Sequence, residues 1–475
     1  MQFDDISLCN KKKYLDIILS KPDIIQKVIS RNINGDWTIE EIPRVWEPGG
    51  GSTLFKLEAS GKKYVLKIKH RSVTVESKLE EEANFIKESS LEHEKNMLKM
   101  IDEEFVPQIL FWDEEEEMQF LAMEYIELSL IEYISSASIS EVLRIWTNLD
   151  NVVKKLYDKD IVHCDLHENN IRCRQNGDIV LIDFEESRKL KQNTTFEESL
   201  DYVGMNDNSK LGEFPHWKHN LDFSTKYNCL NRMKDVFKQY IIKLLPIIVS
   251  ECNYDSTNGI CTALDHGKSD KVYQSINTKY MKVEGQRGFG DNRVDVLKQI
   301  VDILFEKENF TFVDIGSNNG NFCRAIAEQN SKGAYCIGLE GFSKFNVLAR
   351  ALSFIEDYNI KFIDFVCGED DFSDISINHP CIVSICSVWH HIQNKEIFLQ
   401  QLKKQKVEYI FLELATQPEC YQGHTWQEEL DAIVKQLGFR TKEVIMFSKD
   451  YKRPLILIAK DEIDELKLKK LRMRD

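Results

Sequence analysis

The sequence lacks the cysteine patterns of a zinc ribbon or a disulfide scaffold. Its 12 cysteines are scattered, without a CxxC pair or a CxxC...HxxxH array. It also lacks a hydrophobic run that could span a bilayer, because the most apolar helical stretch, 240–249, is short and contains Lys243 and Pro246. No signal peptide and no internal repeat is recognisable. We therefore expect reduced thiols and a cytoplasmic location.

An excess of positive charge is also missing. The formal net charge is -16, from 62 basic and 78 acidic residues. This charge disfavours broad attraction to nucleic acid, and no aromatic and basic platform for single strands is visible, so an RNA-modifying enzyme is disfavoured. The 475 residues, 42% hydrophobic and 29% charged, have the composition of a folded protein with two to three domains.

The stretch 161–186, IVHCDLHENNIRCRQNGDIVLIDFEE, contains the most informative pattern. It reads His163-x-Asp165-x-x-x-x-Asn170, followed by Asp183-Phe184. These residue types suit phosphoryl transfer from ATP: Asp165 would orient an acceptor hydroxyl and take its proton, while Asn170 and Asp183 would supply oxygen ligands to Mg²⁺. The apolar run 179–182 predicts a strand that returns Asp183 to the loop. An ordinary loop and hairpin is the alternative, but five features in the right order and spacing favour the site.

Upstream segments offer groups for the nucleotide. We predict a three-stranded meander over 39–69, whose glycine turn includes Gly50, Gly51 and Ser52. Such a turn allows backbone amides to approach phosphates, although glycine turns also join ordinary hairpins. Lys67 lies on the third strand, where a kinase keeps the lysine that contacts the α and β phosphates. Among several glutamates of the helical segment 78–100, we choose Glu94 as its partner.

The next segments predict a hinge and a core helix. The apolar stretch 120–127 is typical of a buried strand, and the backbone groups of Glu124 to Ile126 could bind adenine. The acidic run 113–117 before it is expected to be a solvated hairpin turn. An apolar stripe over 142–156 predicts a helix that packs in the core.

The residues after Asp183 depart from protein kinases. Glu185 replaces the glycine of the magnesium motif, His167 stands where protein-serine kinases keep a lysine, and no Ala-Pro-Glu motif follows. The segment resembles the kinase-like families that act on sugars and other small hydroxyl compounds, such as lipopolysaccharide-core and aminoglycoside kinases. The resemblance implies an α+β, two-lobed kinase-like domain that uses ATP and Mg²⁺. Asp235 resembles the structural aspartate that opens the helix beneath the catalytic loop.

A second chemical centre begins at Phe310. The pattern predicts a strand (311–315), a tight turn (316–320), a helix (322–329) and a second strand (334–339) that ends in an acidic residue. This arrangement suits a dinucleotide or S-adenosylmethionine (SAM). The turn resembles the first motif of class I SAM methyltransferases, with asparagine replacing a usual glycine, and it lacks the third glycine spacing of a dinucleotide fold. The candidate residues are Asp314, Gly316, Asn318, Gly320 and Glu340.

Later segments keep the order of that methyltransferase family. Five further strands are predicted. They lie at 362–367, within CIVSICSVWHHI (381–392), at YIFLELA (409–415), at TKEVIMFS (441–448) and at RPLILIAK (453–460). Glu369 and Asp370 are positioned for adenine. The resemblance implies an α/β, Rossmann-like class I methyltransferase domain; a doubly wound domain without a cofactor is the alternative.

The acceptor decides which further groups methyl transfer needs. A hydroxyl acceptor would want a base, for which His390 or His391 is the candidate, although such a pair is as often packing. A phosphate acceptor needs cations instead of a base, and Lys282, Arg287 and Arg293 precede the fold. We take Asp165, His390 and Arg287 as the catalytic candidates.

The fusion of the two domains resembles the bifunctional enzymes that terminate bacterial O-antigen chains by phosphorylating and then methylating the terminal sugar. Tyr273-Gln274 and Gln286-Arg287 belong to this resemblance. Here, however, the kinase comes first and no long coiled coil follows. The resemblance implies a sugar or polysaccharide acceptor, phosphorylated with ATP and then methylated with SAM on the phosphate or elsewhere. Two activities with unrelated substrates, or a regulatory pseudokinase fused to a methyltransferase, are the alternatives.

The predicted organisation has five parts. They are an N-terminal helical extension (1–35), the kinase-like domain (36–250), a linker (251–270), the methyltransferase domain (271–460) and a charged tail (461–475). The tail could touch a membrane or a partner, but a solvated terminal helix is the preferred interpretation.

Overall fold

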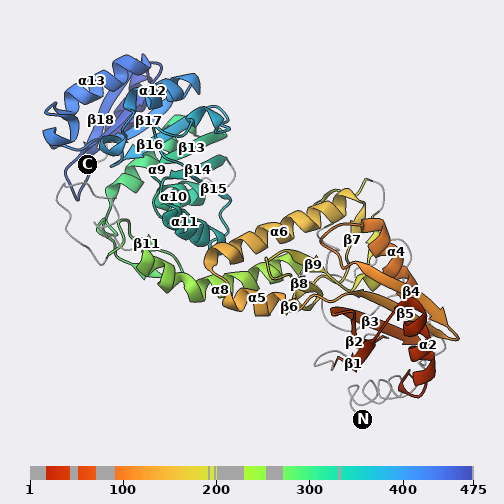
Figure 1. Ribbon diagram of the computed structural model, residues 1–475. Helices are drawn as coiled ribbons and strands as arrows, with labels where there is room; N and C mark the ends of the chain where they lie inside the picture. Colours follow the sequence, from red (N-terminus) through yellow and green to blue (C-terminus); the bar gives the residue numbers. More distant parts are fainter. Residues whose placement is uncertain are drawn as a thin grey trace, which may run out of the picture. The chain divides into compact units, whose positions relative to one another are not determined.

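The computed structural model describes residues 18–42, 52–70, 91–190, 193–196, 199, 229–252, 271–306, 308–329 and 333–472. The chain divides into two compact units, Met1–Phe237 and Lys238–Asp475 (Figure 1). The division falls within helix α8 (Cys229–Glu251). Most of the predicted linker, from residue 253 to 270, lies outside the described residues, so the domain boundaries stay a prediction.

The first unit opens with a five-stranded antiparallel sheet in the order β1-β2-β3-β5-β4. Its strands are β1 (Trp37–Glu41), β2 (Thr53–Ala59), β3 (Lys62–His70), β4 (Ile109–Glu115) and β5 (Met118–Glu124). Ser60 and Gly61 both have positive φ, at 51° and 75°, which suits the two-residue turn between β2 and β3. The three-stranded meander predicted over 39–69 is present as β1 to β3, but β1 begins earlier, at Trp37, and residues 43–51, which include most of the first predicted strand, lie outside the described residues.

Helix α2 (Pro22–Asn32) covers the outer part of this sheet with an apolar face of Ile25, Val28 and Ile29. Basic residues of the helix, and Lys21 just before it, meet the acidic hairpin between β4 and β5. Lys21 Nζ lies 2.8 Å from Glu116, Lys27 Nζ lies 2.6 Å from Glu115, and Arg31 pairs with Asp113. The acidic run 113–117 was predicted to be a solvated turn. The turn is present, but several of its carboxylates are partnered by the helix.

The described part of the first unit also includes helices. It contains α4 (Leu91–Ile101), α5 (Leu130–Ser136) and α6 (Ile139–Asp158). Helices α5 and α6 begin with capping boxes at Ser129 and Ser138. The hydroxyl of each serine accepts the backbone N–H of the glutamate three residues later, and the carboxylate of that glutamate accepts the backbone N–H of the serine. The buried face of α6 includes Val142, Ile145 and Leu149, as the stripe predicted.

Short strands connect these helices to the catalytic segment. A three-stranded sheet has the order β6 (Leu128–Ser129), β8 (Ile171–Cys173), β9 (Ile179–Leu181), and β7 (Ile161–Val162) pairs with β10 (Arg188–Lys189). The prediction for Asp235 is wrong, because α8 begins at Cys229 and Asp235 is an exposed residue within it. Phe237 of this helix is fully buried, and the centre of its ring lies 5.4 Å from that of Trp146.

The second unit is built on a seven-stranded sheet in the order β15-β14-β13-β16-β17-β19-β18. The parallel strands are β13 (Phe310–Ile315), β14 (Ala334–Glu340), β15 (Ile360–Asp364), β16 (Cys381–Cys386) and β17 (Tyr409–Glu413). Strand β19 (Pro454–Ala459) runs antiparallel to both of its neighbours, β17 and β18 (Thr441–Phe447), so β18 has the direction of the parallel strands. Every residue of β13 and β16 is buried, as expected for parallel strands covered on both faces.

Helices cover both faces of this sheet (Figure 1). One face packs against α9 (Asn292–Phe305), α10 (Asn321–Gln329) and α14 (Glu465–Arg472), and the other against α12 (Lys395–Lys404) and α13 (Trp426–Leu437). Helix α11 (Ser343–Ile355) contacts β15 and β14, and the hairpin of β11 (Ile276–Asn277) and β12 (Lys282–Val283) precedes α9. The carboxyl ends of β13, β14 and β16 therefore meet at one edge, where ligands bind in open α/β sheets.

The charged tail contains a packed helix. Helix α14 buries Leu468 and Leu471, and Arg472 pairs with Glu443 at 2.8 Å, while Leu466 stays 64% exposed. Within the described part of the chain, none of the helices combines the length and apolar character needed to cross a bilayer.

Candidate active sites

The catalytic loop lies between β7 and β8 and is held by its own side chains. Asn170 Nδ2 donates to the backbone oxygen of Asp165 at 2.8 Å and to its Oδ2 at 2.9 Å. His163 Nε2 lies 3.0 Å from the oxygen of Ile182, and the N–H of Ile182 donates to Asn170 O at 3.0 Å. These bonds tie the end of the returning hairpin to the loop, so Asp183 follows directly beside Asp165 and Asn170.

Asp183 joins a buried ion-pair cluster with Lys67 and Glu94. Lys67 Nζ lies 2.8 Å from both carboxylate oxygens of Glu94 and 2.7 Å from Asp183 Oδ1. Glu94 is fully buried and also accepts the N–H of Phe184 at 3.3 Å. Burial alone lowers the pKa of Lys67, but the carboxylates of Asp183 and Glu94 outweigh it and the net shift is upward. Three residues predicted from separate segments therefore meet at one point.

Two further glutamates crowd this cluster. Burial, together with the charge of Asp183, raises the pKa of Glu185 to about 7. The pKa of Glu186 is also raised to about 7, mainly by burial and in second place by the negative charge of Asp165. The accumulated negative charge and the hard oxygen donors of Asp165, Asn170 and Asp183 fit Mg²⁺. The sequence marked Glu185 only as a departure from protein kinases, and no pattern pointed to Glu186.

The remaining nucleotide candidates are described in part. Gly50 and Gly51 lie outside the described residues, and Ser52 is buried. The N–H of Glu124 donates to Gln108 O at 2.8 Å, so this backbone group is not available to adenine. The carboxylate of Glu124 binds Arg174 at 2.8 Å, and Ile126 is buried.

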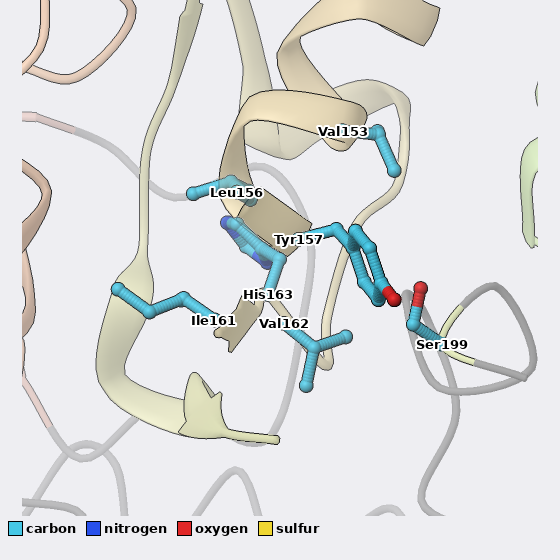
Figure 2. A pocket seen from close by; sticks show the side chains of 7 residues that line it. All are labelled: Val153, Leu156, Tyr157, Ile161, Val162, His163 and Ser199. Carbon is cyan, nitrogen blue, oxygen red and sulfur yellow. The ribbon is translucent and has the colours of Figure 1, made fainter. Parts of the chain in front are cut away.

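A small cavity lies beside the catalytic loop, between α6 and β7 (Figure 2). It is lined mainly by apolar side chains and has room for about one water molecule. Figure 2 shows the His163 ring beside Leu156 and the hydroxyl end of Tyr157 toward Ser199. The cavity is too small for a nucleotide, so we treat it as a packing gap behind the loop.

The glycine turn of the second unit folds back on the end of β14. The N–H groups of Gly316 and Ser317 donate to Leu339 O at 2.8 and 3.0 Å. Asn318 has a φ of 50°, a left-handed conformation that asparagine tolerates better than most residues, which explains how it replaces a glycine. Its N–H donates to Glu340 Oε2 at 2.8 Å, and Glu340 Oε1 accepts from Phe342 at 3.1 Å.

Buried polar atoms without partners gather around this turn. Asp314 is 2% exposed, its Oδ1 accepts from Ser384, and burial raises its pKa to about 7. Among the described residues, Asp314 Oδ2, Asn319 Oδ1 and Gln274 Oε1 have no hydrogen-bond partner. Unsatisfied buried polar atoms are costly, so this edge of the sheet fits a polar ligand.

The adenine candidates occupy an exposed turn after β15. Asp370 Oδ2 accepts the N–H of Val366 at 2.7 Å, which closes the turn, and Glu369 is exposed. Two large apolar side chains nearby, Phe342 and Val366, are 39% and 41% exposed. Sequence reasoning missed these two, because single exposed apolar residues after a strand carry no motif.

Three arginines converge at the ends of β16 and β17. Arg287 Nη2 lies 3.1 Å from Glu413 Oε1, and Arg293 Nη1 lies 2.9 Å from Glu413 Oε2. Arg453 Nη1 donates to Ser387 Oγ at 3.1 Å, and this hydroxyl also bonds Glu413. Burial alone would raise the pKa of Glu413, but Arg293 and Arg287 together lower it to about 2.

This arginine cluster (Arg287, Arg293 and Arg453) carries an excess of positive charge. Its three guanidinium groups face two carboxylates, those of Glu413 and Asp291. Arg287 is 1% exposed and Arg453 is 8% exposed, yet Arg287 Nη1 and Arg453 Nε have no hydrogen-bond partner in the described part of the chain. The guanidinium carbon of Arg287 lies 4.0 Å from the centre of the Tyr451 ring. An anion would satisfy the two open donors.

The predicted base candidates border this cluster. Burial, His391 and Arg453 lower the pKa of His390 to about 3, which makes it a weak proton acceptor. His391 is exposed, and the centres of the two rings lie 4.1 Å apart. Lys282, the other predicted cation, is exposed on β12. Arg453 was missed because it lies 166 residues after Arg287 and belongs to no motif.

The comparison with protein families bears on the first unit. Residues 49–205 match the protein kinase domain family, so the chain contains a protein-kinase-like domain there. No curated protein matches the chain. Among solved structures, the chain is similar to the bifunctional kinase-methyltransferase WbdD, with 18% identity over 38% of this chain and a TM-score of 0.31. The similarity spans 41% of that protein's chain.

Proposed function

We propose that the chain is a bifunctional enzyme that phosphorylates a hydroxyl of a sugar or polysaccharide with ATP and methylates the product with SAM. The observation that carries the first activity is the meeting of Lys67, Glu94 and Asp183 within 2.8 Å, inside a protein-kinase-like domain. A pseudokinase has no need to keep this cluster together with Asp165 and Asn170.

Each residue of the first site has a role in phosphoryl transfer. Asp165 orients the acceptor hydroxyl and takes its proton, and Asn170 fixes its carboxylate through the 2.9 Å bond. Asn170 and Asp183 would hold Mg²⁺, which neutralises charge on the phosphates when bound. Lys67, kept cationic by its two carboxylates, binds the α and β phosphates.

A small hydroxyl compound is the favoured acceptor. The support is the sequence resemblance to sugar and small-molecule kinases, carried by Glu185 and His167. His167 Nε2 lies 3.6 Å from Asp165 Oδ2, so the residue that replaces the protein-kinase lysine is at the proposed acceptor position.

Replacing Asp165 tests the kinase. Asp165→Asn should reduce ADP release with oligosaccharide acceptors by about 10²-fold or more, because the hydroxyl loses its proton acceptor. Asp178→Asn is the matched control, since this exposed aspartate lies in the hairpin of the same segment and outside the cluster. Equal ADP release by wild type and Asp165→Asn would support the pseudokinase instead.

Methyl transfer is proposed for the glycine-turn edge of the second unit. The support is a seven-stranded sheet in the order β15-β14-β13-β16-β17-β19-β18, whose strand β19 runs antiparallel to its neighbours. The Glu340 carboxylate accepts from the backbone N–H groups of Asn318, Gly341 and Phe342, which leaves about one of its four acceptor positions for a ribose hydroxyl. Phe342 and Val366 would flank adenine, and the buried oxygens near Asp314 and Asn319 would face polar groups of the cofactor.

The arginine cluster favours a phosphate as the methyl acceptor. SAM supplies an electrophilic methyl group, so the protein must mainly position a nucleophile and exclude water. A phosphate oxygen is already anionic and needs no base. A hydroxyl would depend on His390 or His391; the pKa of His390 is lowered to about 3, and burial with Arg453 also lowers the pKa of His391, so both are weak bases. Arg287 Nη1 and Arg453 Nε are the donors that would bind the phosphate.

The order of the two reactions can be tested with labelled SAM and oligosaccharide acceptors. Methyl incorporation should require ATP in the wild type, and it should disappear in Asp165→Asn. A chemically phosphorylated oligosaccharide should restore incorporation by Asp165→Asn without ATP. Methylation of the unphosphorylated acceptor in the absence of ATP would reject the sequential scheme and favour two unrelated substrates.

A further inference from the structure

Three different metal-binding side chains lie together at the amino-terminal edge of the second unit's sheet. Cys381 is the first residue of β16, and Glu408 directly precedes β17. Ile382 pairs with Tyr409 in the parallel register, so the preceding residues Cys381 and Glu408 are neighbours across the two strands. His379 stands two residues before Cys381 and completes the group. The arginine cluster and the glycine turn lie at the opposite ends of the parallel strands.

The donor atoms are already close to one another. His379 Nδ1 lies 2.9 Å from Glu408 Oε1 and 3.0 Å from Oε2. One ligand atom from each residue lies within 4.8 Å of the other two. A tetrahedral zinc ion with bonds of about 2.0–2.3 Å separates its ligand atoms by about 3.3–3.8 Å. Small rotations of His379 and Glu408 would therefore place all three donors around one ion.

The surroundings also suit an ion that arrives from solvent. Cys381 is fully buried, whereas the side chains of His379 and Glu408 are 39% and 29% exposed. The thiol therefore lies on the buried side of the group, and the imidazole and carboxylate lie on the side that solvent reaches. The N–H of Cys381 donates to Glu408 Oε2 at 2.9 Å. This bond orients the carboxylate, as hydrogen bonds to the ligands of a metal site commonly do.

We propose that His379, Cys381 and Glu408 form a binding site for Zn²⁺ or a similar divalent transition-metal ion, with water as a fourth ligand. Imidazole, thiolate and carboxylate together are typical ligands for such ions, while Mg²⁺ and Ca²⁺ avoid sulfur. Binding replaces the thiol proton, which leaves to solvent, and the ion with one thiolate and one carboxylate is electrically neutral.

The site would connect the amino-terminal ends of β16 and β17. The proposed methyl-transfer edge is at the opposite, carboxyl-terminal ends of the parallel strands. The role of the site is therefore structural, and it does not depend on the proposed function. Because the three ligands come together only in the folded unit, bound metal stabilises the folded state and raises its thermal midpoint.

Cobalt(II) is a suitable probe, because a thiolate ligand gives it a charge-transfer absorption that oxygen ligands do not. The full-length chain, stripped with a chelator, should bind one equivalent of Co²⁺ with this absorption, and Zn²⁺ should displace the cobalt and raise the thermal midpoint. Cobalt bound at the predicted magnesium site would lack the sulfur band, so the two sites are distinguishable.

Substitutions locate the site. His379→Gln and Glu408→Gln alter partly exposed side chains and should fold, and each should weaken Zn²⁺ binding by at least about 10-fold, since even indirect contacts of a metal site are worth that much. Cys381→Ser should abolish the sulfur band, and Cys420→Ser should leave it unchanged. An unchanged band and affinity in His379→Gln, or the absence of any sulfur band in the wild type, would overturn the proposal and leave a contact between His379 and Glu408 without a metal.

Discussion

Glu94 is the residue whose removal best tests the buried cluster of the first site. Glu94→Ala removes one of the two carboxylates paired directly with Lys67, so the free energy of unfolding should fall by about 3 kcal/mol, as for other broken buried pairs. Glu92→Ala removes an exposed carboxylate of the same helix, 3.6 Å from Lys95, and should change little. Denaturant unfolding of both variants provides the measurement, and equal effects would show that Lys67 does not depend on Glu94.

Asp314 should make the stability of the second unit depend on pH. Its pKa is raised to about 7 in the folded state, so the folded chain holds a proton that the unfolded chain has lost between about pH 4 and 7. Stability contributed by the neutral carboxyl is therefore lost as the pH rises through this window. Asp314→Asn keeps a neutral acceptor for Ser384 and should gain on the order of a few kcal/mol over wild type at pH 8.

The same variant should show almost no gain at pH 4, where the wild-type carboxyl is protonated in the folded state. Thermal unfolding at pH 4, 6 and 8 gives the profile. A gain of the same size at all three values would attribute the effect to packing and would contradict the titration of Asp314.

Residues with fixed spacing could be predicted from the sequence, and residues brought together by the fold could not. Asp165, Asn170 and Asp183 lie within one short segment, and the structure brings them together as that spacing predicts. Arg453 and the unpaired atoms around Asp314 depend on contacts across the whole sheet. The weak basicity of His390 likewise follows from burial and from neighbouring cations, which no linear pattern reports.

At the scale of elements, helix α2 contacts the rest of the unit through an apolar face and through a basic face, and the two contribute differently to its stability. Its ion pairs with the acidic hairpin are exposed and bind side chains with much conformational freedom, so they contribute little. Ile29 is fully buried against the sheet, and Ile29→Ala should lower the free energy of unfolding by about 3 kcal/mol. Arg31→Ala should have a much smaller effect, and one that disappears at about 1 M salt.

Denaturant unfolding at low and high salt distinguishes these contributions. An Arg31→Ala effect as large as that of Ile29→Ala, or one insensitive to salt, would mean that the charged face holds the helix. The comparison also shows why the sequence prediction for the hairpin was incomplete. A run of acidic residues predicts an exposed turn, but the basic helix that meets it lies more than 80 residues earlier.

Strands were the easiest elements to predict, because the buried parallel strands of the second unit are short apolar runs between turns. Helix boundaries were harder. The start of α8 at Cys229 could not be inferred from Asp235, since an acidic residue also occurs on the exposed face of a helix interior.

At the scale of the whole molecule, each compact unit has its own sheet and its own buried cores. The two proposed reactions need no residue in common: the first uses Asp165 and its neighbours, and the second uses the glycine turn and the arginine cluster. A phosphorylated acceptor made by one copy of the chain should therefore serve as substrate for another copy.

Two inactivated variants test this independence. Asp165→Asn should fail to phosphorylate, and Arg287→Lys should fail to methylate, because lysine cannot reproduce the guanidinium that bridges Ser387 and Glu413 and offers Nη1. A mixture of the two variants with ATP and labelled SAM should form the methylated product that neither forms alone. Product from wild type but none from the mixture would mean that the phosphorylated acceptor does not pass between copies, and transfer within one chain would then have to be part of the mechanism.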